Sequence, residues 1–298
     1  MTSANRVRSV ITLEEIFSQP AVWERTLTDQ SLGLERLPRD GEKVLVLGCG
    51  TSFFMGDAWA QMRTAAGLGR TRAAIPSELT WIEDDEIVVA VSRSGTTVDV
   101  VDALQTLSEH HRVVGVIGTP ETPIERLCHE RILLDFADER SVVQTRFATT
   151  GFLALRHAIN RSPGHLLEDA RDALRQPMPL RSEDHFVFLG AGWSVGVAHE
   201  AALKIREASG AWVEAYPLRE YQHGPIAAAS SRTLVWALSP VTADLRDAIA
   251  ATGARLVEAQ RDPLAELIMA QRVAVEMADR AGRDADQPIG LSRSVVTA

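Results

Sequence analysis

Cysteine, lysine and long apolar runs are all scarce in this sequence. Among its 298 residues only Cys49 and Cys128 are cysteines, which is too few for a disulfide framework and gives no zinc-binding spacing. No apolar run reaches the roughly 18 residues that a membrane span needs, and residues 1–10 lack the apolar core of a signal peptide. These absences lead us to expect a cytoplasmic protein with no membrane partner.

Positive charge is scarce as well. The net charge is −9 at pH 7, whereas nucleic-acid-binding proteins usually carry a basic surface, so we expect no nucleic-acid partner. The stretch before residue 40 is also too short for a helix-turn-helix domain, which argues against a DNA-binding regulator. Of the 31 basic residues only Lys43 and Lys204 are lysines, a skew that we ascribe to the base composition of the gene.

The rest of the composition is ordinary. Hydrophobic residues make up 45% and charged residues 24% of the chain, as in typical globular proteins. Apolar runs that end in Gly- and Ser-rich turns alternate with helical periodicity. This predicts an α/β fold in which parallel sheets are flanked by helices on both faces, a three-layer α/β/α arrangement. In the first half, strands are expected at 43–47, 73–75, 86–91, 113–117 and 131–134.

The chain is expected to divide into three parts. Residues 1–40 form an N-terminal helical segment, and its helix is expected to break at Gln19-Pro20 because proline disrupts helices. Residues 41–165 form a first α/β unit that carries a phosphate-binding loop. Residues 166–298 form a second unit with a catalytic helix and a C-terminal tail.

The two units begin alike. VLVLGCGTS at 44–52 and FVFLGAGWS at 186–194 align without a gap, each with an apolar strand, Gly-x-Gly and a serine. We interpret this as an internal duplication that gives two tandem units. The alternative is that doubly wound proteins share such strand-turn patterns for physical reasons alone.

The segment from Ser92 to Thr97, SRSGTT, follows a strand and opens a helix. The N-terminus of a helix offers unpaired N–H groups and favours a phosphate, and Gly95 lets the backbone approach the anion. Plain helix capping is the alternative, since Ser and Thr are preferred caps, but a cap needs one hydroxyl rather than four. The spacing of a P-loop is absent.

No cofactor is expected. Gly48 and Gly50 could begin a dinucleotide-binding turn, but Phe53 stands where the third glycine would be needed. No cluster of metal-ligating residues is visible in the sequence either.

A predicted helix after the Gly190–Gly192 turn carries Glu200, Lys204 and Glu207 on one face. Such a row could be a solvated set of ion pairs, but open α/β sheets bind ligands where this helix begins. A short polar loop is expected to follow, ending in His223, which precedes Gly-Pro in a stiff turn. A lone histidine is more often structural than catalytic.

These motifs together resemble the sugar-isomerase (SIS) domain family, and most of all the isomerase half of glucosamine-6-phosphate synthases. The resemblance covers nearly all of the chain from about residue 40, and the order of the motifs makes it specific. The motifs are GCGTS at 48–52, SRSGTT at 92–97, EAALKIRE at 200–207, EAY at 214–216, EYQHGP at 220–225 and DQPIGLSRSV at 286–295.

The resemblance implies a site for a phosphosugar. Thr51 would face the sugar, and the tail residues Ser292 and Arg293 would lie beside it. The phosphate would be held by Ser52, Ser92, Arg93 (through its backbone), Ser94 and Thr97.

The resemblance also implies the catalytic groups. Glu207 would move a proton between C1 and C2 of the sugar, with support from Lys204 and Glu200. His223 would open the sugar ring, and in the family this histidine comes from the partner subunit. We therefore expect a homodimer with a shared active site, and no cofactor.

Three departures from the synthase pattern shift the expected reaction. No glutaminase domain is expected before residue 40. Arg293 stands where the synthase has its Schiff-base lysine, and a guanidinium cannot form an imine. Gln144 stands where the synthase has a serine near the sugar, so hydroxyl recognition is expected to differ.

We therefore expect a phosphosugar aldose–ketose isomerase or an aminosugar-6-phosphate deaminase. The alternatives are a phosphosugar sensor without catalytic activity and a glutamine-independent, transaminase-like isomerase.

Overall fold

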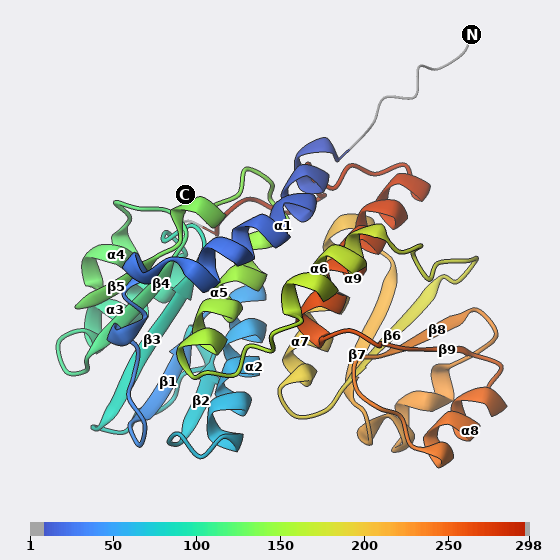
Figure 1. The fold of residues 1–298 in the computed structure, drawn as a ribbon, viewed down its shortest axis with the longest axis horizontal. Coiled ribbons are helices and arrows are strands. Elements are labelled where there is room, and N and C mark those ends of the chain that lie inside the picture. Colours follow the sequence, from blue (N-terminus) through green and yellow to red (C-terminus); the bar gives the residue numbers. More distant parts are fainter. Residues whose placement is uncertain (1–8, 296–298) are drawn as a thin grey trace, which may run out of the picture.

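The computed structural model describes residues 9–295 and contains two β-sheets that lie side by side (Figure 1). The first sheet has five strands in the order β2-β1-β3-β4-β5, and the second has four in the order β7-β6-β8-β9. The strands are β1 (Lys43–Leu47), β2 (Thr71–Ala74), β3 (Glu86–Ser92), β4 (Val113–Ile117), β5 (Glu130–Leu133), β6 (His185–Gly190), β7 (Trp212–Pro217), β8 (Thr233–Ala237) and β9 (Arg255–Glu258).

Every pair of neighbouring strands is parallel. All seven residues of β3 are buried, as expected for a central strand that is covered by helices on both faces. The central strands β1, β4, β6 and β8 are similarly apolar and buried. The α/β class with parallel sheets flanked by helices, predicted from the sequence, is thereby confirmed.

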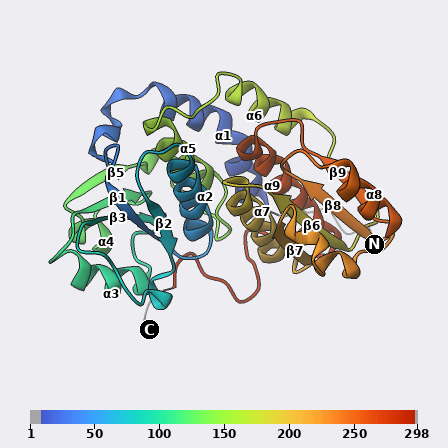
Figure 2. The same cartoon turned by 90° about the horizontal axis from the view of Figure 1, so that it is seen from below.

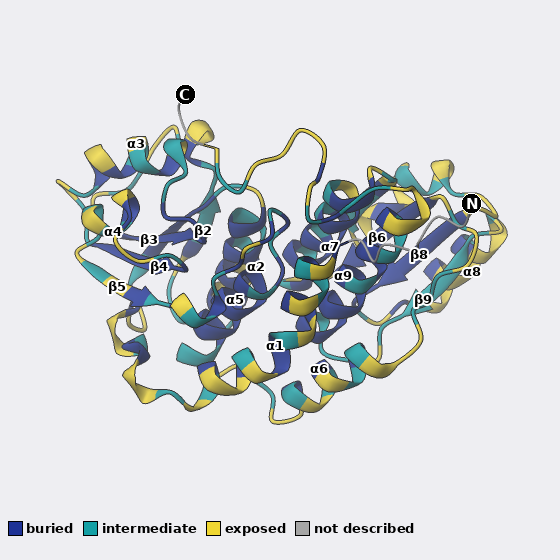
Figure 3. Ribbon diagram, turned by 90° about the horizontal axis from the view of Figure 1, so that it is seen from above, coloured by how far each residue is buried: buried dark blue, intermediate teal, exposed yellow. Residues whose placement is uncertain are grey.

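Helices fill the space between the sheets and cover their outer faces. They are α1 (Val10–Thr28), α2 (Thr51–Ala65), α3 (Val98–Leu107), α4 (Pro123–Leu127), α5 (Arg146–Ala158), α6 (Leu166–Arg175), α7 (Ser194–Ser209), α8 (Ala243–Ala251) and α9 (Pro263–Arg280). Helices α2 and α7 pack against each other between the two sheets (Figure 2). Many of the residues on α2, α5, α7 and α9 are buried, as the dark blue in Figure 3 shows. No helix among residues 9–295 is both long and apolar enough to cross a membrane.

The predicted break at Pro20 is wrong, because α1 continues through it from Val10 to Thr28. Proline lacks the N–H that would bond to the carbonyl of Ile16, and an unpaired buried carbonyl is costly. The amide Nε2 of Gln19 donates to that carbonyl at 3.2 Å. The residue before the proline thus satisfies the acceptor that the proline leaves open.

Gln19 is also the centre of a buried polar chain that joins three helices. Thr149 of α5 donates to Gln19 at 2.6 Å and accepts from the indole of Trp23 at 3.0 Å. On the other side, Gln19 donates to Gln271 of α9 at 2.7 Å. Buried polar groups cost little when each finds a partner, so this chain fixes α1 on the core.

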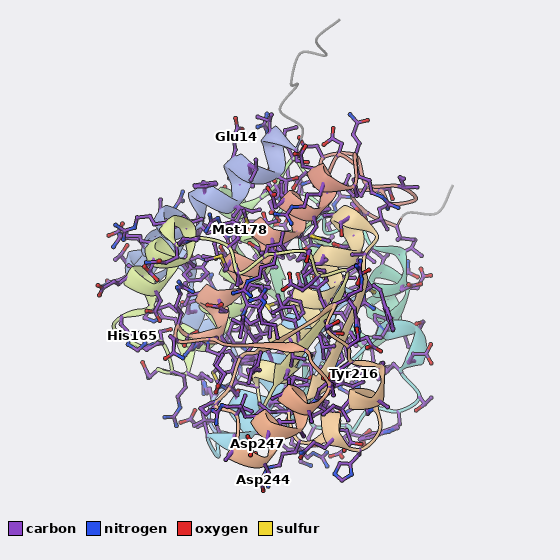
Figure 4. The ribbon with its side chains drawn as sticks, turned by 90° about the vertical axis from the view of Figure 1, so that its right-hand side faces the viewer. Glu14, His165, Met178, Tyr216, Asp244 and Asp247 are labelled. Atoms are coloured by element: carbon purple, nitrogen blue, oxygen red, sulfur yellow. The ribbon has the colours of Figure 1, made fainter. Side chains whose placement is uncertain are left out.

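The sequence patterns did not predict the edge strand β7, residues 212–217, which lies between α7 and the polar loop that ends at His223. Its polar side chains have partners within the sheet. Glu214 accepts from Tyr216 at 2.8 Å and meets the ring of His185 at 2.7 Å (Figure 4 shows Tyr216). These polar residues interrupt the apolar pattern that would otherwise indicate a strand.

The three-part division of the chain stays a prediction. In both sheets the strand that comes first in the chain lies between the next two strands: β1 lies between β2 and β3, and β6 lies between β7 and β8.

The two ends of the described chain are joined to each other. The carboxylate of Asp286 accepts from the backbone N–H groups of Ile11 and Thr12 at 3.0 and 2.8 Å. It also accepts from the hydroxyl of Thr12 at 2.6 Å. A residue from the far end of the chain therefore caps the N-terminus of α1, where a negative charge is favoured.

Replacing this cap should destabilise the fold. We expect Asp286→Ala to lower the free energy of unfolding by about 1–2 kcal/mol, because three hydrogen bonds at the start of α1 are lost. Urea denaturation measures the change, with Asp247→Ala as control, since Asp247 is exposed on α8 (Figure 4). Equal stability of both variants and the parent chain would show that the cap contributes nothing.

Candidate active site

The loops that follow β1 and β3 meet at the carboxyl edge of the first sheet, where α/β proteins commonly bind ligands. A cavity of about 200 Å³ lies there. It is lined by Cys49, Gly50, Thr51, Arg93, Thr97, Val142, Gln144, Glu207, Leu291, Ser292, Arg293, Ser294 and Val295. Residues of the 92–97 loop and Glu207 thus line one cavity. The loop follows β3 of the first sheet, whereas Glu207 lies on α7, which packs on the second sheet.

The loop from Ser92 to Thr97 is held in shape by its own hydroxyls. Ser92 Oγ accepts from the N–H of Gly95 at 3.0 Å, and Ser94 Oγ accepts from the N–H of Thr96 at 3.3 Å. Gly95 has φ +64°, and a Cβ there would lie 2.1 Å from the hydroxyl of Thr122. A glycine is therefore required at the point where the loop turns into α3.

Helix capping does not account for the hydroxyl of Thr97. Thr97 precedes the first residue of α3, but its side chain makes no capping hydrogen bond. Its hydroxyl is therefore available to the cavity that it lines.

The side chain of Arg93 is buried and bonded to the backbone of neighbouring segments. Its guanidinium donates to the carbonyls of Ser141 at 2.8 Å, Val142 at 3.2 Å and Arg293 at 2.6 Å, and the residue is 2% exposed. The guanidinium is thus engaged by carbonyls of the protein, and the predicted contact of a phosphate with the backbone of Arg93 stays a prediction.

Glu200, Lys204 and Glu207 are not a solvated row of charges. Glu200 is 0% and Lys204 1% exposed, and α2 packs against α7, the helix that carries them. The ammonium of Lys204 donates to Glu207 at 2.5 Å and to the hydroxyl of Thr51 at 2.9 Å, and it lies 3.4 Å from Glu200. Thr51 in turn donates to Glu200 at 3.2 Å.

Burial sets the charge state of this cluster. It raises the pKa of Glu200 to about 7, against the opposing effect of the Lys204 charge. For Lys204, burial alone would lower the pKa, but the carboxylates of Glu200 and Glu207 raise it above its ordinary value. Lys204 is therefore an ammonium at neutral pH, and its charge is shared by two carboxylates.

Only Glu207 of this cluster reaches the cavity. Its side chain is 20% exposed, while Lys204 and Glu200 lie behind it. A carboxylate at the wall of a cavity, with an ammonium fixed beside it, is suited to take a proton from a bound ligand and to return it. Among residues 9–295, no group of three His, Cys, Asp or Glu side chains is placed to hold a metal ion.

The structure brings seven of the predicted site residues to the cavity wall. They are Thr51, Arg93, Thr97, Gln144, Glu207, Ser292 and Arg293. Five more are buried but do not line it, namely Ser52, Ser92, Ser94, Glu200 and Lys204. Their roles toward a ligand stay predictions.

His223 is the one predicted residue that lies apart. It is exposed and follows the 3-10 turn Glu220–Gln222, outside the cavity of its own chain. A role at the site would require it to come from a second subunit.

Sequence reasoning missed several cavity residues. Cys49 lies in the GCGTS turn, and burial raises the pKa of its thiol to about 11, so it is a neutral lining group. Ser294 and Val295 belong to the DQPIGLSRSV motif, and membership of this motif could have indicated that they line the cavity. Val142 had no signal, since its place depends on how the segment before α5 folds over the first sheet.

No model of a known protein family matches the chain. Its sequence relatives include the isomerizing glutamine–fructose-6-phosphate aminotransferases of Thermus thermophilus, 26% identical over 95% of this chain, and of Acidithiobacillus ferridurans, 28% identical over 88%. The chain spans a little over half of these relatives, 58% and 53% of their lengths.

Solved structures show the same fold. Glucosamine-6-phosphate deaminase of Thermotoga maritima has a TM-score of 0.82 at 24% identity, covering 96% of this chain and 99% of its own. Tagatose-6-phosphate ketose/aldose isomerase of Escherichia coli has a TM-score of 0.76 at 18% identity, covering 95% and 98%. These findings confirm the resemblance to the SIS-domain family and to the isomerase region of the aminotransferases.

The raised pKa of Glu200 predicts a pH-dependent stability. Between pH 4.5 and about 7 the folded chain binds a proton at Glu200 that the unfolded chain has lost, so this residue destabilises the fold increasingly as the pH rises. We expect Glu200→Gln to gain stability relative to the parent chain across this window, by up to on the order of 3 kcal/mol.

Urea denaturation at pH 5 and pH 8 measures this difference. Glu168→Gln, changed at an exposed position of α6, serves as the control. A difference between Glu200→Gln and the parent that is constant with pH would contradict the raised pKa.

Proposed function

We propose that this chain is an enzyme that moves a proton between C1 and C2 of a hexose or hexosamine 6-phosphate, as an aldose–ketose isomerase or an aminosugar-phosphate deaminase. The observation that carries this proposal is the shared cavity of Thr97 and Glu207. The names of the relatives, an isomerizing aminotransferase, a deaminase and a ketose/aldose isomerase, support the substrate class.

The phosphate would bind at the N-terminus of α3, where the helix dipole favours an anion. The donors would be the hydroxyls of Ser92, Ser94 and Thr97 and the backbone of Arg93, and Ser92 also shapes the loop by accepting from the N–H of Gly95. Ser52 lies in the first turn of α2, beside Thr51, which would face the sugar. A ligand held in this way reaches from the loop to Glu207 within one cavity.

Glu207 would act as the base. It removes the proton from C2 of the open-chain aldose, and protonation of O1 gives an enediol. It then returns the proton to C1 while O2 loses its proton, which gives the ketose. Lys204 holds the Glu207 carboxylate in place at 2.5 Å. Thr51 and Glu200 continue the hydrogen-bonded chain behind it.

Arg293 argues against the synthase reaction. Its Nη2 lies 2.5 Å from Asp138, and its Nε donates to the carbonyl of Glu139 at 3.1 Å. The side chain is thus bound to the first unit, and a guanidinium forms no imine in any case. An isomerase or a deaminase, neither of which takes nitrogen from glutamine, is the better fit.

The remaining expectations belong to the same proposal. His223 would come from the partner of a homodimer and open the sugar ring, since it lies outside the cavity of its own chain. The two sheets, with β1 and β6 in equivalent places, are consistent with two tandem SIS units. We further propose that the protein works in the cytoplasm.

The acid–base role of Glu207 can be tested directly. We expect Glu207→Gln to keep phosphosugar binding but to lose turnover by a factor of about 10² or more, because the amide cannot accept the proton. Turnover and binding of a panel of hexose and hexosamine 6-phosphates are measured, with Glu168→Gln as control. Undiminished turnover in Glu207→Gln would remove this residue from the role.

A sensor without catalytic activity makes a different prediction. An isomerase or deaminase places deuterium from the solvent at C1 or C2 of the sugar phosphate, and NMR detects it. Binding of a hexose phosphate without any such exchange would favour the sensor. Release of ammonia from a hexosamine 6-phosphate would then distinguish a deaminase from a simple isomerase.

A further inference from the structure

The C-terminal tail, residues 286–295, lies directly on the hydroxyl-rich loop. The hydroxyls of Ser94 and Thr96 donate to Ser294 Oγ at 3.1 and 3.0 Å. The backbone N–H of Val98, the first residue of α3, donates to the carbonyl of Val295 at 3.1 Å. Three donors at the mouth of the helix are thus engaged by the tail.

Two arginines hold the tail in this place. Arg293 bonds through Nη2 to Asp138 at 2.5 Å and through Nε to the carbonyl of Glu139 at 3.1 Å. Its own carbonyl accepts from the buried guanidinium of Arg93 at 2.6 Å. The tail is therefore fixed from both sides, immediately before the residues that contact the loop.

Most residues between Asp286 and Arg293, the two points where the tail is attached, are exposed. Asp286 is bonded to the start of α1, and from there the chain crosses from α9 to the first sheet (Figure 2). Ile289 is 78% and Leu291 45% exposed. Gly290 has φ +75° and nothing within 4 Å of the position of a Cβ. Pro288 is buried at the start of this bridging segment, and the exposed residues that follow it, Ile289 to Ser292, carry little packing that would resist movement.

The tail engages Ser94, one of the proposed phosphate donors, and two further donors at the start of α3, the hydroxyl of Thr96 and the N–H of Val98. Hydroxyls and a backbone N–H at a helix N-terminus suit a phosphate, and a charged acceptor bonds more strongly than the neutral oxygens of Ser294 and Val295. The cavity beneath the tail measures about 200 Å³, below the roughly 300–1,000 Å³ of typical ligand pockets.

From this we infer that the tail is an internal competitor of the phosphate: Ser294 and Val295 occupy the anion-binding donors, and a phosphate ester displaces them and frees Arg293 from Asp138. The identity of the anion rests on the proposed function, but the competition rests on the contacts alone. Because only the open form binds, the apparent affinity for phosphate is reduced by the fraction of molecules that are open.

Weakening the tail should therefore strengthen phosphate binding. We expect Ser294→Ala, which removes the acceptor for two hydroxyls, to bind inorganic phosphate about five- to tenfold more tightly than the parent chain. Asp138→Asn, which removes the ion pair with Arg293, should act in the same direction. Isothermal titration calorimetry measures both, with Ser31→Ala at an exposed turn as control.

Trypsin gives a second, independent readout. Cleavage after Arg293 requires its guanidinium to enter the protease, so the bond to Asp138 protects it. We expect inorganic phosphate, but not chloride at equal ionic strength, to accelerate this cleavage, and Asp138→Asn to be cleaved quickly without phosphate. Mass spectrometry identifies the shortened chain.

The outcomes separate this inference from the proposed function. If phosphate binds with equal affinity to the parent chain and both variants, and Arg293 stays protected, the tail does not compete, while the phosphate site stands. If neither inorganic phosphate nor a hexose 6-phosphate binds even to Ser294→Ala, the anion site itself is wrong, and both proposals fall.

Discussion

The site depends on one buried ammonium. Lys204 lies between Glu200 and Glu207 and contacts Thr51, so a single positive charge offsets two carboxylates inside the protein. Burying charges is expensive, and removing the central partner would leave two like charges in a medium of low polarity. The cluster is therefore a costly feature of the fold, and the chemical role proposed for Glu207 would account for it.

This ammonium also joins the two halves of the site. Thr51 begins α2 of the first sheet, whereas Lys204 and Glu207 belong to α7 of the second. The packing of α2 against α7 therefore positions the carboxylate relative to the hydroxyl-rich loop. A change in that packing would separate the proposed base, Glu207, from the proposed phosphate site without altering either group.

Sequence patterns predicted the class of fold and the segments that meet at the cavity, because strand ends and glycine turns are local features. They did not predict that α1 passes through Pro20, since the side chain of Gln19 replaces the missing bond. They also missed β7, where Glu214 is paired with the distant His185 as well as with Tyr216 of the same strand. Contacts between residues far apart in the chain leave no local periodicity, and the contact of Ser294 with Ser94 is of this kind.

Arg93 and Arg293 act together in fixing the C-terminal tail. Arg293 removes the imine-forming amine of the synthase pattern, and its guanidinium is instead used to bind Asp138. Arg93 donates to the carbonyl of Arg293, so the loop that would hold a phosphate and the tail that covers it are joined by the same two side chains. A planar guanidinium bonds several acceptors at once, which a lysine ammonium at either position would do less rigidly. Arg93 and Arg293 together therefore fasten the tail to the hydroxyl-rich loop and to the segment around Asp138.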